Sequence, residues 1–330
     1  MRVRFWGVRG SIPTPATGED ISLRLIEALL HLGKDPAQSA APLDLNCRES
    51  VTQWVQALPP SRFSLVGGNT PCIEMTTGDG ELFIIDFGSG LRALSDNLVQ
   101  GAFGEGKGRA HLFLSHFHWD HIQGWPFFKP AYIEGNEFDL YARHEGVEEL
   151  LKKQQEPPFF PPAAWDEMHA TVRIHTLPET PVELCAGQVR VSSLELEHPS
   201  RAFAFRFEAD GKAFVYASDG AFPPPDSDAA QSVIEFFRDA DLLVFDAQFS
   251  QSESVQKHGW GHSSSESGVE LACRARAKRL ALFHHAPGAT EAHLETLLHA
   301  GRQRSLQPTL PCLPGEVEVF LAREGLEVEL

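Results

Sequence analysis

The feature that most constrains this chain is a cluster of metal-binding residue types directly after a short apolar run. Residues 112–114 (Leu-Phe-Leu) are followed by His116, His118, Asp120 and His121. In an extended chain the first two histidines point to one side, and the last two residues follow as the chain turns into a helix. Imidazole and carboxylate ligands without cysteine are typical of metal sites that keep a position open for water. The pattern therefore predicts a strand that ends at a metal site able to serve two cations.

Short apolar strands alternate with helical segments along most of the chain. Residues 21–30 and 49–58 have helical spacing and indicate a helical insertion over about 18–62. No segment has the composition of a linker, so we expect a single domain over 1–330, with sheet layers covered by helices. The Pro- and Phe-rich segment 156–165 is expected to be a loop packed on the core, or an apolar wall or lid beside the site. Further strands are expected over 2–8, 72–76, 82–86, 110–115, 138–142, 189–197, 202–208, 213–217 and 242–245, and helices over 146–153, 229–238, 264–275 and 291–301.

Charge and composition limit the partners. The chain has 28 Lys and Arg against 45 Asp and Glu, a formal net charge of -17, which would repel a long nucleic acid. No apolar run approaches the ~20 residues of a membrane span, and the N-terminus lacks the apolar stretch of a signal peptide, so we expect a cytoplasmic protein with no membrane partner. The five cysteines are odd in number, widely spaced and never in a CxxC pair, so neither a disulfide framework nor a thiolate zinc site is predicted.

The His-x-His-x-Asp-His motif resembles that of the metallo-β-lactamase-fold hydrolases, and the resemblance covers essentially the whole chain outside the insertion. It implies an α/β protein, a four-layer αββα sandwich with a dinuclear metal site along one edge. In that family the remaining ligands follow later strands, and here His198, Asp219 and His284 each follow an apolar strand. The resemblance implies that one cation is held by His116, His118 and His198, that the other is held by Asp120, His121 and His284, and that Asp219 bridges both.

The resemblance also implies two divalent ions that share a hydroxide. Zinc is the expected ion, with manganese or iron as alternatives. His285 neighbours His284 and would point the other way in a strand, so we expect His284 as the ligand and His285 as an outer contact or a buried side chain. The other histidines follow no strand-end pattern, and surface or core positions are expected for His31, His111, His144, His169, His175, His293 and His299.

Three Gly-containing segments, 4–13, 67–72 and 85–90, look like the branch that contains ribonuclease Z and related phosphodiesterases. Their glycines permit tight turns near the metals, and Asp86 is placed to hydrogen-bond a ligand histidine. In ribonuclease-Z-like enzymes a histidine before a helix assists at the scissile phosphate and a carboxylate orients it. The counterparts here are His262 and Asp246, although Phe245 stands where those enzymes usually show histidine. We count Asp120 with these two among the expected catalytic residues; the alternative for His262 is a neighbour of the helix cap.

The expected function is therefore a dinuclear metal-dependent hydrolase, a phosphodiesterase for a small or cyclic phosphodiester. The alternative within the same fold is hydrolysis of a thioester, lactone or amide. The segments 69–71 and 257–264 favour phosphoesters over these acyl substrates. A third class, a metal-dependent binding, oxygen-reducing or sensing protein, would favour iron and a flavin domain. The sequence shows no long basic arm of the kind that clamps tRNA, which favours a small substrate. A homodimer is left open, and the insertion is expected to shape access to the pocket or to serve in dimerisation or packing.

Overall fold

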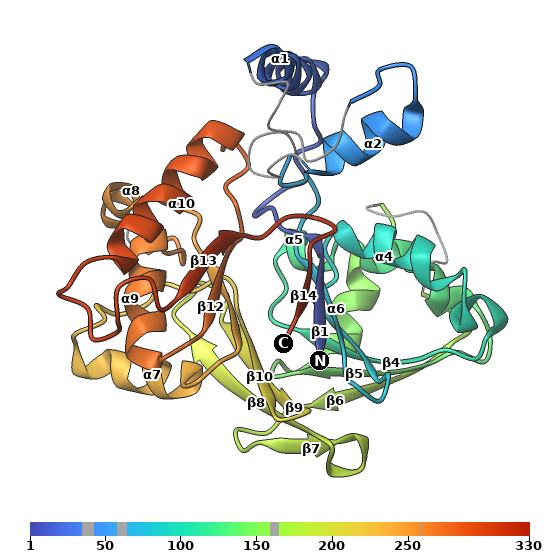
Figure 1. The fold of residues 1–330 in the computed structure, drawn as a ribbon. Coiled ribbons are helices and arrows are strands. Elements are labelled where there is room, and N and C mark those ends of the chain that lie inside the picture. Colours follow the sequence, from blue (N-terminus) through green and yellow to red (C-terminus); the bar gives the residue numbers. More distant parts are fainter. Residues whose placement is uncertain (35–42, 58–64, 159–164, 258) are drawn as a thin grey trace.

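Two mixed sheets form the centre of the protein, whose computed structural model describes residues 1–34, 43–57, 65–158, 165–257 and 259–330 (Figure 1). The first sheet contains β1 (Arg2–Gly7), β2 (Cys72–Thr76), β3 (Leu82–Ile85), β4 (Arg109–Leu114), β5 (Glu137–Ala142), β6 (Thr171–Thr176) and β14 (Glu327–Glu329). The second contains β7 (Val182–Leu184), β8 (Val189–Leu196), β9 (Ala202–Ala209), β10 (Lys212–Ala217), β11 (Leu242–Asp246), β12 (Arg279–Phe283) and β13 (Glu318–Leu321). The strand orders are β14-β1-β2-β3-β4-β5-β6 and β13-β12-β11-β10-β9-β8-β7.

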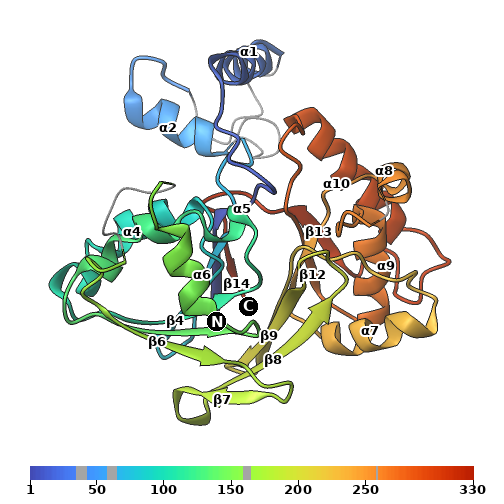
Figure 2. The same ribbon diagram turned by 180° about the vertical axis from the view of Figure 1, so that it is seen from behind.

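Helices cover the outer face of each sheet (Figures 1 and 2). On the first sheet lie α4 (Gly90–Leu98), α5 (Trp119–Ile122) and α6 (Val147–Gln154). On the second lie α7 (Gln231–Phe237), α8 (Gln251–Gln256), α9 (Ser265–Ala275) and α10 (Glu291–Ser305). Short 3-10 turns connect the elements: η1 (Ala102–Glu105), η2 (Trp125–Phe127), η3 (Lys129–Tyr132), η4 (Cys185–Gly187) and η5 (Asp228–Ala230). The architecture is the predicted αββα sandwich.

Side chains of β4 alternate between two apolar layers, one between the sheets and one under the helices. Phe113 points between the sheets, where its ring packs edge-on against Phe205 and Phe207 at centroid distances of 5.4 and 5.0 Å. Leu112 and Leu114 point to the opposite face and join the apolar cluster under the helices of the first sheet. Successive side chains of a strand point to opposite faces, so a continuous apolar run is what a strand between two layers requires.

The insertion stands apart from both helical layers. Its helices are α1 (Gly18–Lys34) and α2 (Arg48–Ala57), and they lie beyond one end of the sandwich in both views (Figures 1 and 2). Arg24 of α1 lies 3.8 Å from Glu291 at the start of α10, which ties the insertion to the second helical layer. Both helices were predicted; residues 35–42 and 58–62 of the predicted insertion lie outside the described residues, as do 159–164 of the Pro- and Phe-rich segment.

One cysteine pair differs from the prediction made from the sequence. The prediction of no disulfide is wrong for one pair, since Cys273 of α9 bonds to Cys312. These cysteines are 39 residues apart and become neighbours because the chain returns past α9 after α10, a juxtaposition that spacing alone does not reveal. Among the described residues, no helix combines the length and the apolar character that a membrane crossing requires.

Candidate metal centre

The chemically active residue types collect at one edge of the sandwich because the strands that precede them end there. β10, β11 and β12 run parallel, so their carboxyl ends meet at the same edge. Asp219, Asp246 and His284 lie at or just after these ends. His116 follows β4 of the first sheet, and His198 follows β8 of the second. The two sheets therefore contribute to one cluster between them.

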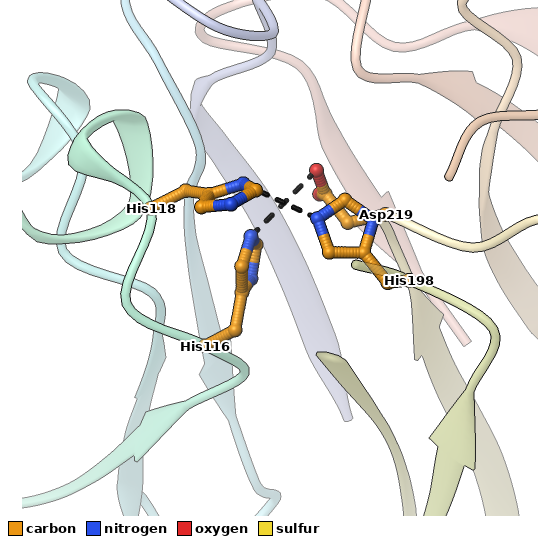
Figure 3. A group of neighbouring side chains, drawn as sticks. All are labelled: His116, His118, His198 and Asp219. Atoms are coloured by element: carbon orange, nitrogen blue, oxygen red, sulfur yellow. Dashed lines mark hydrogen bonds and ion pairs between the residues drawn. The ribbon is translucent and has the colours of Figure 1, made fainter. Parts of the chain in front are cut away.

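The first group of potential ligands contains His116, His118, His198 and Asp219, whose nearest ligand atoms all lie within 4.8 Å of one another (Figure 3). Nδ1 of His118 lies 3.2 Å from Nε2 of His198, and Nε2 of His116 lies 3.9 Å from Asp219. The four side chains converge from three different segments on one point, as the sticks in Figure 3 show. Three imidazoles and one carboxylate are a donor set that suits zinc.

The second group contains Asp120, His121, Asp219 and His284, with ligand atoms within the same 4.8 Å limit. Nε2 of His284 lies 3.2 Å from an oxygen of Asp120 and 3.2 Å from an oxygen of Asp219. Nε2 of His121 lies 3.1 Å from the other oxygen of Asp219. Asp219 is thus the member common to both groups, and its two oxygens face different neighbours.

The protonation states of Asp219, Asp120 and His116 favour cation binding. Burial raises the pKa of Asp219, but the imidazoles of His284, His121 and His116 outweigh it and hold that pKa well below its usual range. The pKa of Asp120 is likewise lowered, against burial, by His121 and His284. Burial holds the pKa of His116 well below its usual range. Ionised carboxylates and neutral imidazoles are the forms that ligate metals.

Two buried histidine nitrogens give a further test of whether these residues fit a metal ion. Nε2 of His116 and Nε2 of His121 are buried and have no hydrogen-bond partner among the described residues, although both face carboxylate oxygens of the cluster. Burial lowers the pKa of His121, but the carboxylates of Asp219, Asp120 and Asp86 outweigh it and raise that pKa well above its usual value. Without a cation this histidine would carry a proton to offset the carboxylates. A divalent cation would supply that charge instead, so the residues fit a metal.

Asp86 contacts His121 on the side of the imidazole that faces away from the cluster. Its carboxylate is fully buried and lies 2.7 Å from Nδ1 of His121. It also accepts hydrogen bonds from the backbone N–H and the hydroxyl of Ser115, and from the hydroxyl of Tyr216 at 2.6 Å. These bonds fix the carboxylate, which in turn leaves Nε2 of His121 facing the cluster. A hydrogen bond from Asp86 to a ligand histidine was predicted from the sequence. Tyr216 was not predicted as a partner of Asp86, because its sequence context is that of any buried strand residue.

The half-buried His262 and the buried Asp246 form a second pair beside the cluster. Nδ1 of His262 lies 2.7 Å from Oδ2 of Asp246, and the ring of His262 stacks on that of His284 at 5.0 Å between centroids. The Asp246 carboxylate also accepts the backbone N–H groups of Asp219 and Gln248, each at 3.1 Å. Burial lowers the pKa of His262, but the Asp246 carboxylate outweighs it and raises the pKa to about 9. The pair therefore presents a protonated imidazole next to both ligand groups.

His284 and His285 part as the sequence analysis expected. His284 lies in the second group, whereas Nε2 of the buried His285 lies 2.9 Å from the backbone carbonyl of Ala322. Burial lowers the pKa of His285 to about 3, so it stays neutral away from the cluster. His284 has a φ of 58°, as have Asp219 and Asp86. Three left-handed residues at strand ends of one site are a concentration of backbone strain that is typical of functional sites.

Several contacts of the site could not be read from residue types alone. The backbone N–H of Ser11 donates to Asp120 at 2.7 Å, and the side-chain amide of Gln248 lies 3.2 Å from Nδ1 of His284. A Cβ on Gly10 would lie 2.5 Å from the ring of His284, so the loop after β1 needs glycine there. The loop after β1 was predicted from the sequence as a turn but not as a contact to a named ligand, and Gln248 was not predicted to contact His284.

Two cavities open beside His262. One, of about 570 Å³, is lined by Ser11, Gln248, Phe249, Lys257 and Trp260 among others. The other, of about 580 Å³, lies across His262 and is lined by Glu197, Phe222, 223–225 and Ser264 among others. Both have room for a small molecule next to the imidazole.

Comparisons with known proteins agree with this fold. A ribonuclease Z of Haloarcula marismortui is 22% identical over 305 residues, which cover 76% of this chain and 88% of the relative. The crystal structure of the short form of human tRNase Z covers 100% of this chain and 99% of its own, with a TM-score of 0.58 and 16% identity. That of a diphosphatase from the PhnP family covers 100% and 97%, with a TM-score of 0.56 and 18% identity.

The family described as "Beta-lactamase superfamily domain" matches residues 83–285, which include the His-x-His-x-Asp-His motif and His284. This match spans more than half of the chain. The protein therefore belongs to the beta-lactamase superfamily, with the metallo-β-lactamase fold that its two sheets and flanking helices display.

Proposed function

We propose that this metal-dependent hydrolase binds two divalent cations, zinc in the first place, and cleaves a small or cyclic phosphodiester. The observation that supports this most strongly is the position of Asp219, which belongs to both ligand groups. One cation would be held by His116, His118 and His198, the other by Asp120, His121 and His284, with Asp219 between them. Bound there, such cations would lower the pKa of a water molecule and offset charge on the phosphoryl oxygens.

The residues of the chain would supply the proton chemistry. Asp246 accepts the Nδ1–H of His262, which leaves Nε2 as the nitrogen free to face a substrate. In its protonated form this Nε2–H would donate to a phosphoryl oxygen or to the leaving oxygen of the ester. The stack on His284 keeps the imidazole close to the cluster, so a phosphoryl group there would lie within its reach.

Phosphodiester chemistry is favoured over acyl chemistry by the His262 and Asp246 pair and by the names of the relatives. The relative from Haloarcula marismortui is named a ribonuclease, an enzyme that cleaves phosphodiester bonds. The alkoxide that leaves a phosphodiester needs a proton more than the thiolate that leaves a thioester does, and the half-buried imidazolium of His262 suits that need. A small substrate rather than RNA is favoured by the formal net charge of -17, which opposes a polyanion.

A substrate panel tests this proposal. Metal-loaded protein would be assayed on a nitrophenyl phosphodiester, a cyclic nucleotide, a precursor tRNA, a lactone and a thioester, each with and without a chelator. We expect chelator-sensitive turnover of the nitrophenyl phosphodiester and the cyclic nucleotide. Turnover of the lactone or thioester alone would overturn the phosphodiester assignment, and cleavage of the tRNA alone would overturn the small-substrate assignment.

A further inference from the structure

A separate group of potential ligands lies toward the other end of β4. It contains Glu81, just before β3; His111, within β4; and Cys185, directly after β7. Their ligand atoms lie within 4.8 Å of one another. His111 precedes His116 by about five residues, roughly 16 Å at the ~3.3 Å rise of a strand, so the two groups are distinct.

We propose that Glu81, His111 and Cys185 form an additional zinc-type cation site that joins the two sheets. The sulfur–nitrogen separation suits a tetrahedral ion: with Zn–S near 2.3 Å and Zn–N near 2.0 Å, these two atoms should lie roughly 3.5 Å apart, while the carboxylate of Glu81 would have to move somewhat closer. Sγ of Cys185 lies 3.4 Å from Nε2 of His111, and an oxygen of Glu81 lies 4.0 Å from the same nitrogen. Three protein ligands would leave the fourth position to water.

His111 is oriented for this role by its neighbours. Its ring stacks on Phe83 at 4.8 Å between centroids and lies 5.9 Å from the ring of Tyr141. Nε2 of His111 is the nitrogen that faces Cys185 and Glu81. The other nitrogen, Nδ1, is buried and has no hydrogen-bond partner among the described residues. Burial lowers the pKa of His111, which keeps its imidazole in the neutral form that ligates metals.

The free thiol of Cys185 is a poor nucleophile, and a bound cation would be needed to convert it to thiolate. Burial and the carboxylate of Glu81 raise the pKa of its thiol to about 11, so at neutral pH the free thiol stays protonated and is a poor nucleophile. A bound cation would remove that proton, because thiolate is the ligating form. Metal binding at this site should therefore release a proton.

The site would link segments that share no strand pairing. Glu81 and His111 belong to the first sheet, whereas Cys185 ends the edge strand β7 of the second. Cys185 and Ala186 have φ values of 52° and 55°, so the turn that carries the thiol across to the first sheet is itself strained. A cation that binds only the folded arrangement stabilises it by mass action.

Titration of chelator-treated protein with Co²⁺ tests this proposal. We expect a thiolate-to-cobalt charge-transfer band in the wild type, its loss in Cys185→Ser, and one equivalent of Co²⁺ fewer in that variant. His111→Gln should behave in the same way. Cys47→Ser, which changes an exposed free cysteine, is the matched control and should keep the band.

Turnover of a nitrophenyl phosphodiester should be unchanged in Cys185→Ser, because none of these three residues lies in the other ligand groups. Absence of the band in the wild type, or its persistence in Cys185→Ser, would overturn the additional site. A protein that shows the band but hydrolyses no phosphodiester would contradict the proposed function and leave this site standing.

Discussion

Nδ1 of His262 lies 2.7 Å from the fully buried carboxylate of Asp246, and the same carboxylate accepts the backbone N–H of Asp219. One side chain thus links the proposed proton donor to the backbone of the residue shared by both ligand groups. A change in the proton donor and a change in a ligand should therefore have different signatures, although the two lie side by side.

His262→Ala should leave the metal content unchanged and lower turnover of an alkyl or ribose phosphodiester by roughly 10²- to 10⁴-fold, the range for a lost general acid. With a nitrophenyl ester the defect should be much smaller, because that leaving group needs no proton. His293 also lines the cavity of about 570 Å³ beside His262, so His293→Ala is the control and should have little effect. An equally large defect with both esters would make His262 a stabiliser of the phosphoryl oxygens instead of an acid.

The rate with an alkyl ester should depend on pH through the same residue. The pKa of His262 is raised to about 9, so the imidazole is protonated below that pH and loses its proton as the pH rises through it. We expect the turnover number to fall as the pH rises through the pKa of this imidazole, at or below about pH 9, because bound cations would offset the carboxylates of Asp219 and Asp120 that help to raise it. Asp246→Asn removes the carboxylate that raises this pKa and should move the fall toward the ordinary histidine value near 6.5. An unchanged pH profile in Asp246→Asn would contradict this assignment.

Asp86→Asn should weaken cation binding without removing a ligand. The amide keeps the shape of the buried carboxylate but loses its charge behind His121, and changes of this kind typically cost 10- to 100-fold in metal affinity. Competition with a chelator would measure it. Asp139→Asn changes a comparable aspartate–histidine pair, with His175, outside the cluster, and should leave catalysis unaffected. Equal losses of activity in both variants would indicate a general effect on folding.

Gly10→Ala should disturb His284 through contact alone. The added Cβ would lie 2.5 Å from the His284 ring and 2.7 Å from the amide of Gln248, so the loop or the ring must move. We expect reduced cation affinity and turnover with near-normal secondary structure by circular dichroism. Gly18→Ala adds the same atom where nothing lies within 4 Å, and it should be neutral. Wild-type turnover in Gly10→Ala would show that the loop yields without moving His284.

Most of the fold could be predicted because its central strands are apolar runs bounded by turns. β10, β11 and the hairpin of β2 and β3 were expected within a residue or so of their bounds. The edge strands were missed: β6 is mostly exposed or half-buried, and β14 is a three-residue strand with one buried side chain, Val328. Such edge strands form because they pair with a neighbouring strand, and the residue pattern alone does not indicate that pairing.

The candidate site followed from the sequence to a similar extent. Residues of ligating type after apolar strands were found because parallel strand ends meet at one edge, and the structure brings all seven proposed ligands into two adjoining groups. Contacts made by the backbone or by ordinary polar residues, such as those of Ser11 and Gln248, were not predicted from the sequence. The group of Glu81, His111 and Cys185 was also missed, because its members are far apart in sequence and become neighbours only when the two sheets pack.

The most direct test of the central claim is the metal content of Asp219→Ala. It should be measured together with turnover in a Cys185→Ser background, so that only the two main ligand groups are counted. The parent should contain about two ions per chain, and Asp219→Ala should lose at least one of them and most of its activity while it remains folded. An Asp219→Ala protein that keeps both ions and full turnover would contradict the claim that this carboxylate joins two cations in a hydrolytic site.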